Sequence, residues 1–395
     1  MSKKLIAFLI LVLAFVSSCE ETPEPEIRIW HGTNQKVGHL GLAQDDFNLM
    51  GEFTNSKIVT TLQFQLNDDP YQNLQFGKDP SGGRRLAAEN HFNADISIEE
   101  LNLGENTVSI QALDKYGRAI REVVTLNKLQ GDYQLPVQIR WKDIADPQNV
   151  VQFVDGEWLK VKNGLRTEHT GYDRMFIVGT KDWQDYEVTV PITINKVDDQ
   201  TSKVSGGNGV GILMRFTSHV IGGYRNFPVA QPKWGYQPFG AIGWLRWEKG
   251  KLQVPPQKQF FAGYSDVQLN HGEFPIRIGG KYIFKVRCET LSEIPKAGLV
   301  KDKQILIEED YIIHKAGKRV KQKVAEDQQK WVTQYNFKIW NIEDAEPLKW
   351  DWQVIQVSTH ALQKGGVAFI AHHIDATFGD INIEPIAIGP ANGIN

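Results

Sequence analysis

The sequence has too few cysteines for a fold that several disulfide bonds hold together. Cys19 and Cys288 are the two cysteines in 395 residues. Stability must therefore come from a hydrophobic core, and a chain of this length can bury a large one. A strong charge bias is also missing, because the formal net charge is only −3. We accordingly expect no nucleic-acid partner.

Long hydrophobic runs are absent as well, apart from one at the N-terminus. Lys3-Lys4 precedes the apolar segment Leu5–Val16, which is too short for a standard membrane-spanning helix. Ser17-Ser18-Cys19 follows it. This order of basic, apolar and small residues predicts a secretory signal peptide over residues 1–18.

The end of that segment adds a second signal. Val16-Ser17-Ser18-Cys19 resembles the lipobox of bacterial lipoproteins, which implies that Cys19 becomes the lipidated first residue. Residues 19–26, rich in Glu and Pro, would then be a solvated tether. We expect a cell-envelope protein, anchored to the membrane through Cys19 and facing the periplasm or the outside. The alternative is an ordinary signal peptide followed by a chance cysteine.

Residues 27–130 are predicted to form a small separate β domain. Ile58–Leu66 alternates in polarity, and Leu103–Ala112 is joined to Arg121–Leu126 by a D-x-x-G turn typical of a hairpin. The pattern LGENTVSIQALDKYGR resembles the last two strands of bacterial immunoglobulin-like domains, which implies a spacing or docking module. His31 and His39 lack nearby metal-binding partners, so we interpret them as ordinary hairpin or surface residues.

A second, larger domain is predicted over residues 137–390. Short alternating segments are separated by Gly-rich turns, which favours an all-β sandwich or barrel over βαβ units. The strand pattern is least clear in the charged stretch 295–330, which is predicted to be a long loop or a hairpin insert. The expected strands are Trp158–Val161, Arg174–Val178, Tyr186–Ile194, Val210–Phe216, Ala241–Trp247, Tyr282–Glu289, Tyr335–Trp340, Val367–His372 and Phe378–Ile383.

Five motifs occur in a telling order in this region: DGEWLKV, KDWQDYEV, GVGILMRF, GKYIFKVR and GGVAFIAHH followed by FGDINIEP. This layout is similar to the concanavalin A-like lectin/glucanase superfamily, including laminin-G-like domains, and to bacterial 3-keto-disaccharide hydrolases. The resemblance implies a two-sheet jelly roll whose concave sheet often binds glycans. The expected fold is thus all-β, an immunoglobulin-like sandwich followed by a concanavalin-like jelly roll.

Alternation along the predicted strands assigns side chains to faces. If the strands are neighbours in one sheet, its non-core face is basic and aromatic, which suits an acidic glycan because Trp stacks on sugars and Arg binds carboxylate or sulfate. The alternative is a solvated face with cross-strand ion pairs. The residues on this predicted face are Arg215, Trp244, Arg246, Arg287, Lys338, Trp340 and His372.

An aromatic loop is predicted between two of these strands. Trp234 and Tyr236 lie in a segment rich in Pro and Gly. We expect them either to form one wall of the glycan site or to pack over the sheet as a small satellite core.

Catalytic carboxylates are hard to find. A retaining glucanase needs two carboxylates on one strand face, and neither Asp182-Trp183-Gln184-Asp185-Tyr186-Glu187 nor Glu308-Glu309-Asp310 has the expected E-x-D-x-E spacing. His372, His373 and Asp375 could act in acid–base chemistry or bind metal, but adjacent histidines on a strand should point to opposite faces. Catalytic residues therefore stay unassigned.

Calcium is implied by the resemblance alone. Many superfamily members hold a structural Ca²⁺ through an Asp in the final strand, and Asp380 stands at the matching place. A surface Asp without metal is the alternative. Our first functional hypothesis is carbohydrate binding, with a glycoside hydrolase or polysaccharide lyase acting through the same groove as the second. The third is an envelope structural or adhesion protein.

Overall fold

The computed structural model describes residues 25–54, 56–77, 85–200, 207–218, 239–263, 268–295, 304–307, 310–315, 318–323, 330–359 and 361–386. In these ranges the chain is all-β, with four short 3₁₀ turns. These turns are η1 (Ser56–Ile58), η2 (Ile98–Glu100), η3 (Trp141–Asp143) and η4 (Pro147–Asn149). None of the described segments forms a helix long and apolar enough to cross a membrane.

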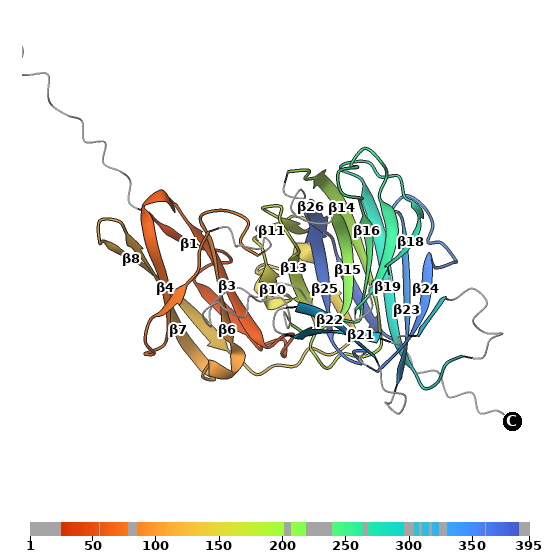
Figure 1. Ribbon diagram of the computed structural model, residues 1–395, viewed down its shortest axis with the longest axis horizontal. Coiled ribbons are helices and arrows are strands. Elements are labelled where there is room, and N and C mark those ends of the chain that lie inside the picture. Colours follow the sequence, from red (N-terminus) through yellow and green to blue (C-terminus); the bar gives the residue numbers. More distant parts are fainter. Residues whose placement is uncertain are drawn as a thin grey trace, which may run out of the picture.

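The N-terminal module consists of two sheets packed around a common core (Figure 1). One sheet has the order β1-β3-β6 and the other the order β2-β8-β7-β4-β5. The β7–β8 pair is the hairpin expected from the D-x-x-G turn. The strands are β1 (Ile27–Ile29), β2 (Asn34–Val37), β3 (Asp46–Phe53), β4 (Val59–Leu66), β5 (Gln72–Leu74), β6 (His91–Ser97), β7 (Gly104–Asp114) and β8 (Ala119–Lys128).

A seven-stranded sheet forms one layer of the large domain, in the order β10-β13-β25-β15-β16-β17-β18. It joins strands from the start and the end of the domain, as expected, because β25 lies between β13 and β15. The strands are β10 (Gln152–Asp155), β13 (Arg174–Val178), β15 (Gly209–Phe216), β16 (Ala241–Arg246), β17 (Gln257–Ala262), β18 (Gln268–Glu273) and β25 (Gly366–His372).

A ten-stranded sheet forms the other layer, in the order β11-β12-β26-β14-β19-β23-β24-β20, with β27 paired to β14 and β9. The strands are β9 (Val137–Ile139), β11 (Trp158–Val161), β12 (Gly164–Thr167), β14 (Tyr186–Val197), β19 (Lys281–Leu291), β20 (Gln304–Ile307), β23 (Trp331–Asn341), β24 (Trp352–Ser358), β26 (Ile374–Phe378) and β27 (Ile381–Pro385). The charged insert also contains a separate hairpin, β21 (Asp310–Lys315) with β22 (Lys318–Lys323).

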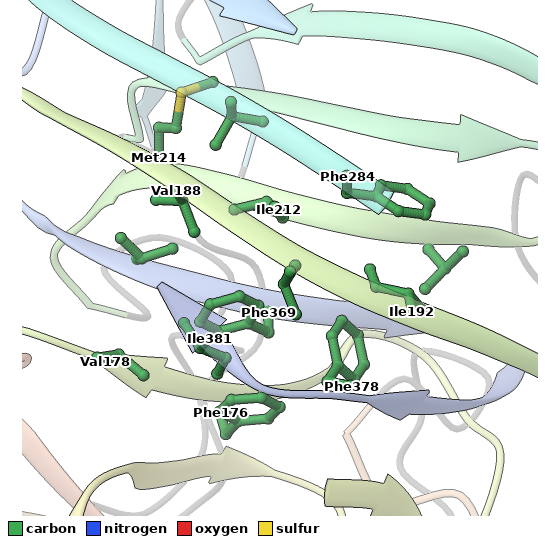
Figure 2. Close-up of a cluster of buried hydrophobic side chains, with 14 of the residues drawn as sticks. Phe176, Val178, Val188, Ile192, Ile212, Met214, Phe284, Phe369, Phe378 and Ile381 are labelled. Carbon is green, nitrogen blue, oxygen red and sulfur yellow. The ribbon is translucent and has the colours of Figure 1, made fainter. Parts of the chain in front are cut away.

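The hydrophobic core lies between these two layers (Figure 2). Ile212 and Phe369 enter it from the seven-stranded sheet, and Val188, Ile192 and Phe284 enter it from the ten-stranded sheet. All of these side chains are fully buried. Cys288 is also buried there and is not disulfide-bonded. Burying this much apolar surface, at about 25 cal/mol per Å², is what stabilises a domain without disulfides.

The two domains share an extensive interface. Trp30 and Met50 of the N-terminal module belong to the core of the large domain. The His31 ring stacks on Phe153 at 3.7 Å, and His39 hydrogen-bonds the carbonyl oxygen of Gln148 at 2.6 Å. The two histidines therefore make separate contacts across the interface, and His31 is a partly buried docking residue instead of a surface one.

Each predicted strand overlaps an observed one, although β14, β19 and β23 extend beyond the predicted bounds. Phe378–Ile383 is divided between β26 and β27. Strand β15 has a bulge at Arg215, where φ is 56°. The bulge changes the alternation, so Met214 faces the inner core and Phe216 joins a cluster on the outer face. The prediction that Ile212, Met214 and Phe216 share one face is therefore wrong for Phe216.

Candidate functional site

The residues of the predicted glycan face divide among three environments. Trp244, Arg246 and His372 belong to the seven-stranded sheet, whereas Arg287, Lys338 and Trp340 belong to the ten-stranded sheet. Arg215 lies between the layers. The assumption that all their strands are neighbours in one sheet is therefore wrong, because alternation identifies the side of a strand but not the sheet it joins.

On the ten-stranded sheet the basic residues are paired with acids. Glu187 accepts from Arg287 Nε at 3.1 Å and lies 2.8 Å from Lys285 Nζ. Glu346 lies 2.8 Å from Lys338 Nζ. Hydrogen bonds from Lys338 and Lys285 lower the pKa of Glu346. The positive charge expected on this face is thus largely cancelled by cross-strand and loop carboxylates.

Two aromatic residues of that face contact the side chain of Lys338. Its ammonium group lies 5.6 Å from the Trp340 ring centroid and 4.7 Å from that of Trp350. Lys338 and Trp340 are both buried, and Lys338 also donates to the carbonyl oxygen of Pro347 at 2.7 Å. This arrangement is a cation–π contact within the protein.

Arg215 is a structural residue inside the sandwich. Its side chain is 0% exposed. Its guanidinium donates to Asp185 at 3.2 Å, to the hydroxyls of Thr290 and Thr333, and to the carbonyl oxygen of Leu362 at 2.6 Å. Asp185 is thereby occupied, and it also accepts the Thr290 N–H at 2.7 Å. With Glu187 paired to Lys285 and Arg287, two of the three acids of the DWQDYE motif have structural partners. The third, Asp182, lies 3.8 Å from Lys364 Nζ.

Trp244 is the tryptophan in the hydrophobic cluster on the outer face of the seven-stranded sheet. Gly209 and Gly211 on the neighbouring strand β15 leave room for it, since a Cβ at Gly209 would come within 2.8 Å of the ring. Its indole Nε1 donates to Gln259 at 2.8 Å, and the Arg246 guanidinium lies 4.6 Å from the ring centroid. Trp244 is 6% exposed. The prediction that Trp244 and Arg246 share a face is confirmed by this contact.

A polar ladder leads from Trp244 toward the edge of this sheet. Gln259 receives the indole N–H and donates its own amide to Asn270 at 2.7 Å. Asn270 is on the exposed edge strand β18, directly opposite Gln259. The ladder therefore connects a buried aromatic ring with solvent through two side-chain amides.

A buried carboxylate–imidazole pair lies beside Trp244. His372 Nδ1 and Asp173 Oδ1 are 2.6 Å apart, and both side chains are buried. The His372 ring centroid is 6.3 Å from that of Trp244 and 4.7 Å from that of Tyr172. An ionised carboxylate can only accept a hydrogen bond, so Nδ1 is the protonated nitrogen when the imidazole is neutral.

The backbone is unusual on both sides of this pair. Asp173 has φ of 50° and His373 has φ of 56°. These left-handed conformations are uncommon for residues other than glycine and concentrate at functional sites. The His373 N–H donates to Gly171 O at 2.7 Å, which ties the end of β25 to the turn that carries Asp173.

The two adjacent histidines do not point to opposite faces. Strand β25 ends at His372, and the left-handed backbone of His373 brings the two ring centroids within 4.5 Å. Burial, together with the neighbouring His372 and Arg174, lowers the pKa of His373 to about 3. His373 is therefore neutral at physiological pH.

Sequence reasoning did not identify Asp173. It stands in the turn Gly171-Tyr172-Asp173, and nothing in that turn indicates a contact with a histidine 199 residues away. The β13–β25 pairing makes the contact, because it places Arg174 opposite Ala371 and so brings the residues just before and after them together. Only knowledge of that strand pairing could have revealed the pair.

Asp380 has a structural partner. Its Oδ1 accepts the Trp141 N–H at 2.9 Å, joining the start of the large domain to its last strand. No group of three or more His, Cys, Asp or Glu among the described residues could hold a metal ion. Asp375 binds Arg166 and Asn195 instead of the histidines beside it. The described residues around Asp380 therefore do not form a calcium site without further ligands.

A groove of about 440 Å³ opens at one end of the sandwich. Trp247, Leu252, Val254, Pro256 and Ile278 are among its lining residues. It contains none of the predicted glycan residues. Cys19, Trp234 and Tyr236, and with them Glu308-Glu309, lie outside the described residues.

No protein-family model matches the chain, and a search of curated proteins gives no match either. Solved structures give distant matches. The VIP36 exoplasmic/lumenal domain in its Ca²⁺/Man2-bound form has 10% identity and a TM-score of 0.35, over 65% of this chain and 90% of that chain. A xylan β-1,4-xylosidase from Bacillus halodurans C-125 has 11% identity and a TM-score of 0.30, over 88% and 64%. Similarity this low transfers no ligand, metal or reaction, so the all-β assignment rests on the sheets themselves.

Proposed function

We propose that this protein binds a carbohydrate on the outer face of the seven-stranded sheet, around Trp244. The observation that carries the proposal is the combination of an indole ring, a guanidinium stacked on it and a buried Asp173–His372 pair at one end of one sheet. Aromatic rings stack on the apolar faces of sugars, and polar groups around them bind the hydroxyls. Arg246 would favour a sugar that carries a carboxylate or sulfate.

Ligand contact with this site requires movement of the chain. Trp244 is 6% and His372 is 3% exposed, so a sugar can reach the two rings only if the groups that cover them move. Binding should therefore change the fluorescence of the tryptophans and should be slower than diffusion. The exposed end of the polar ladder, at Asn270, is the natural point of first contact.

The buried pair also favours a second function, cleavage of a glycosidic bond. A neutral imidazole held by a carboxylate is suited to take a proton from a substrate at pH 7. We keep this as the alternative, with His372 as the proton acceptor. The protein would then be a hydrolase or a lyase, and analysis of the products would distinguish these two reactions.

Attachment to the bacterial cell envelope through a lipid on Cys19 is part of the proposal and rests on the sequence alone. Mass spectrometry of the membrane-extracted protein tests it. A lipidated N-terminal peptide is expected from the wild type, and Cys19→Ala should yield an unlipidated protein.

The first experiment is a glycan array followed by calorimetry on residues 27–395, with uronate-containing and sulfated polysaccharides, in calcium and in EDTA. We expect binding that Trp244→Ala weakens at least tenfold and that Arg287→Ala leaves unchanged. EDTA sensitivity would indicate a bound calcium, whose ligands would then have to be found.

Other outcomes would redirect the proposal. Loss of binding in Ile278→Arg but not in Trp244→Ala would place the ligand in the 440 Å³ groove. New oligosaccharides on chromatography, absent in His372→Gln, would establish the enzyme. No binding and no products across the panel would refute both and leave a structural or adhesion role.

A further inference from the structure

A buried ion cluster crosses the boundary between the two domains. Arg85 of the N-terminal module lies 3.6 Å from Asp95 in its own module and 3.4 Å from Asp155 in the large domain. Arg174 pairs with the same Asp155 and donates to the carbonyl oxygen of Arg85 at 3.3 Å. These four side chains are almost completely buried. Charge signs therefore alternate across the interface, from Asp95 to Arg174.

The far end of this cluster reaches the Asp173–His372 pair. Arg174 is the residue after Asp173, and its side chain lies against Gly156 and Gly171. A Cβ on either glycine would overlap the Arg174 side chain. The Arg174 guanidinium thus fills the space under the turn Gly171–Asp173, in which Asp173 has its left-handed backbone.

Such a backbone conformation persists only when its surroundings enforce it. Two contacts enforce this one: the His373 N–H bond to Gly171 O, and the Arg174 side chain beneath the turn. Arg174 is in turn fixed by Asp155 and by Arg85, and Arg85 belongs to a different domain. An unbroken series of contacts therefore links the turn that carries Asp173 with a residue of the N-terminal module.

We propose that Arg85 is a positioning residue for the Asp173–His372 pair, so that the N-terminal module is a working part of the ligand site and not a spacer. Arg85 acts through Asp155 and Arg174 and does not touch the ligand. The effect on affinity rests on the proposed carbohydrate function. The effect on His372 does not depend on that function.

A second arginine that bridges the two domains provides a control in the same interface. Arg28 of the N-terminal module also bridges the domains, through Glu157 at 2.5 and 2.8 Å, and it binds Glu52 as well. It makes none of the contacts described for Asp155 or Arg174. Arg28 is 48% exposed and Arg85 is 1% exposed, so their losses would change stability unequally even if the interface were purely adhesive. A change in the bond between His372 and Asp173 is expected only from the loss of Arg85.

The test uses protein with ¹⁵N-labelled histidine, compared by NMR as wild type, Arg85→Gln, Arg85→Lys and Arg28→Gln. The Nδ1–H signal of His372, assigned from its disappearance in His372→Gln, reports the bond to Asp173. Near-ultraviolet circular dichroism checks that each variant is folded. If Arg85→Gln fails to fold, Asp155→Asn tests the same link from the large domain with a side chain of nearly the same shape.

We expect Arg85→Gln to lose or shift the His372 Nδ1–H signal, Arg85→Lys to restore it in part, and Arg28→Gln to leave it unchanged. Affinity for the glycan found on the array should fall at least tenfold in Arg85→Gln only. A folded Arg85→Gln, or Asp155→Asn in its place, with wild-type His372 signals would overturn the proposal. Equal changes in Arg28→Gln and Arg85→Gln would overturn it too. If no glycan binds, the proposed function fails, but the NMR comparison still decides whether Arg85 positions the pair.

Discussion

The outer faces of the two sheets of the large domain use similar side chains in opposite ways. On the seven-stranded sheet, Trp244 and the Asp173–His372 pair are buried and held in fixed contacts. On the ten-stranded sheet, Lys285 and Arg287 form partly exposed pairs with Glu187. One face is built around a few buried polar groups, and the other combines partly exposed ion pairs whose charges cancel with the buried contact between Lys338 and Trp340.

The difference shows that residue type alone does not separate a candidate site from an ordinary surface, because the partners and burial of each side chain must also be known. A buried polar group without partners costs free energy, so a buried pair that persists must be well hydrogen-bonded. An exposed ion pair contributes little and can be lost without consequence. The Asp173–His372 pair is therefore the more informative feature, although Arg287 and Lys338 give the more obvious signal in the sequence.

The largest effect should come from Arg215, which lies between the faces. Arg215→Ala removes four hydrogen bonds and leaves Asp185 without its cation in a largely buried setting. We expect a loss of about 3–5 kcal/mol in the free energy of unfolding, as for other broken buried ion pairs. Urea denaturation measures it. A loss below about 1 kcal/mol would mean that Arg215 behaves as a surface residue, as on the ten-stranded face.

The pH dependence of stability should come from the interface and from the seven-stranded side. Burial lowers the pKa of His31 to about 4 and of His91 and His373 to about 3, against about 6.5 in the unfolded chain. The unfolded state then binds more protons, so stability falls as the pH decreases below 6.5. Burial raises the pKa of Asp155 to about 6, which has the opposite sign and offsets part of the loss.

Between pH 6 and pH 4 the net loss should be roughly 1–3 kcal/mol per pH unit. Denaturant unfolding at a series of pH values measures the slope. His91→Gln and His373→Asn should each reduce it, since each removes a group that is neutral when folded and protonated when unfolded. An unchanged slope in the double variant would contradict this assignment.

A smaller effect is expected from the polar ladder. Trp244→Phe keeps an aromatic ring but removes the N–H bond to Gln259, which is itself buried. The cost should be about 1–3 kcal/mol, the range for a buried group that loses its partner. Thermal unfolding measures the change, and Trp340→Phe on the other sheet is the matched control. A cost equal to that of the control would remove the distinction between the two faces.

Much of the fold could be predicted from local pattern. Arg174–Val178 and Trp158–Val161 were predicted with the observed bounds, because alternation and Gly-containing turns are local properties of the chain. The prediction that Trp244 and Arg246 share a face was also correct. Two residues on the same strand keep their relation whatever sheet the strand joins.

The candidate site could not be predicted in the same way. Which sheet a strand joins depends on contacts between distant segments, and this is why Arg287 and Trp244 were wrongly placed on one face. The bulge at Arg215 depends on Tyr186, whose hydroxyl accepts the Arg215 N–H at 2.7 Å. Asp173 meets His372 only because β13 and β25 are neighbours. Each of these facts is a matter of pairing between strands that are far apart in the sequence.

The smallest effect should come from Arg287 on the ten-stranded face. Its side chain is 35% exposed, and Glu187 keeps a second cation in Lys285 when Arg287 is removed. Arg287→Ala should therefore cost less than about 1 kcal/mol and should not weaken glycan binding. Urea denaturation and calorimetry on the same preparation measure both. Loss of binding without loss of stability would instead identify the ten-stranded face as the ligand site. A partly exposed ion pair that does not stabilise the fold can lower affinity only through direct contact with the ligand.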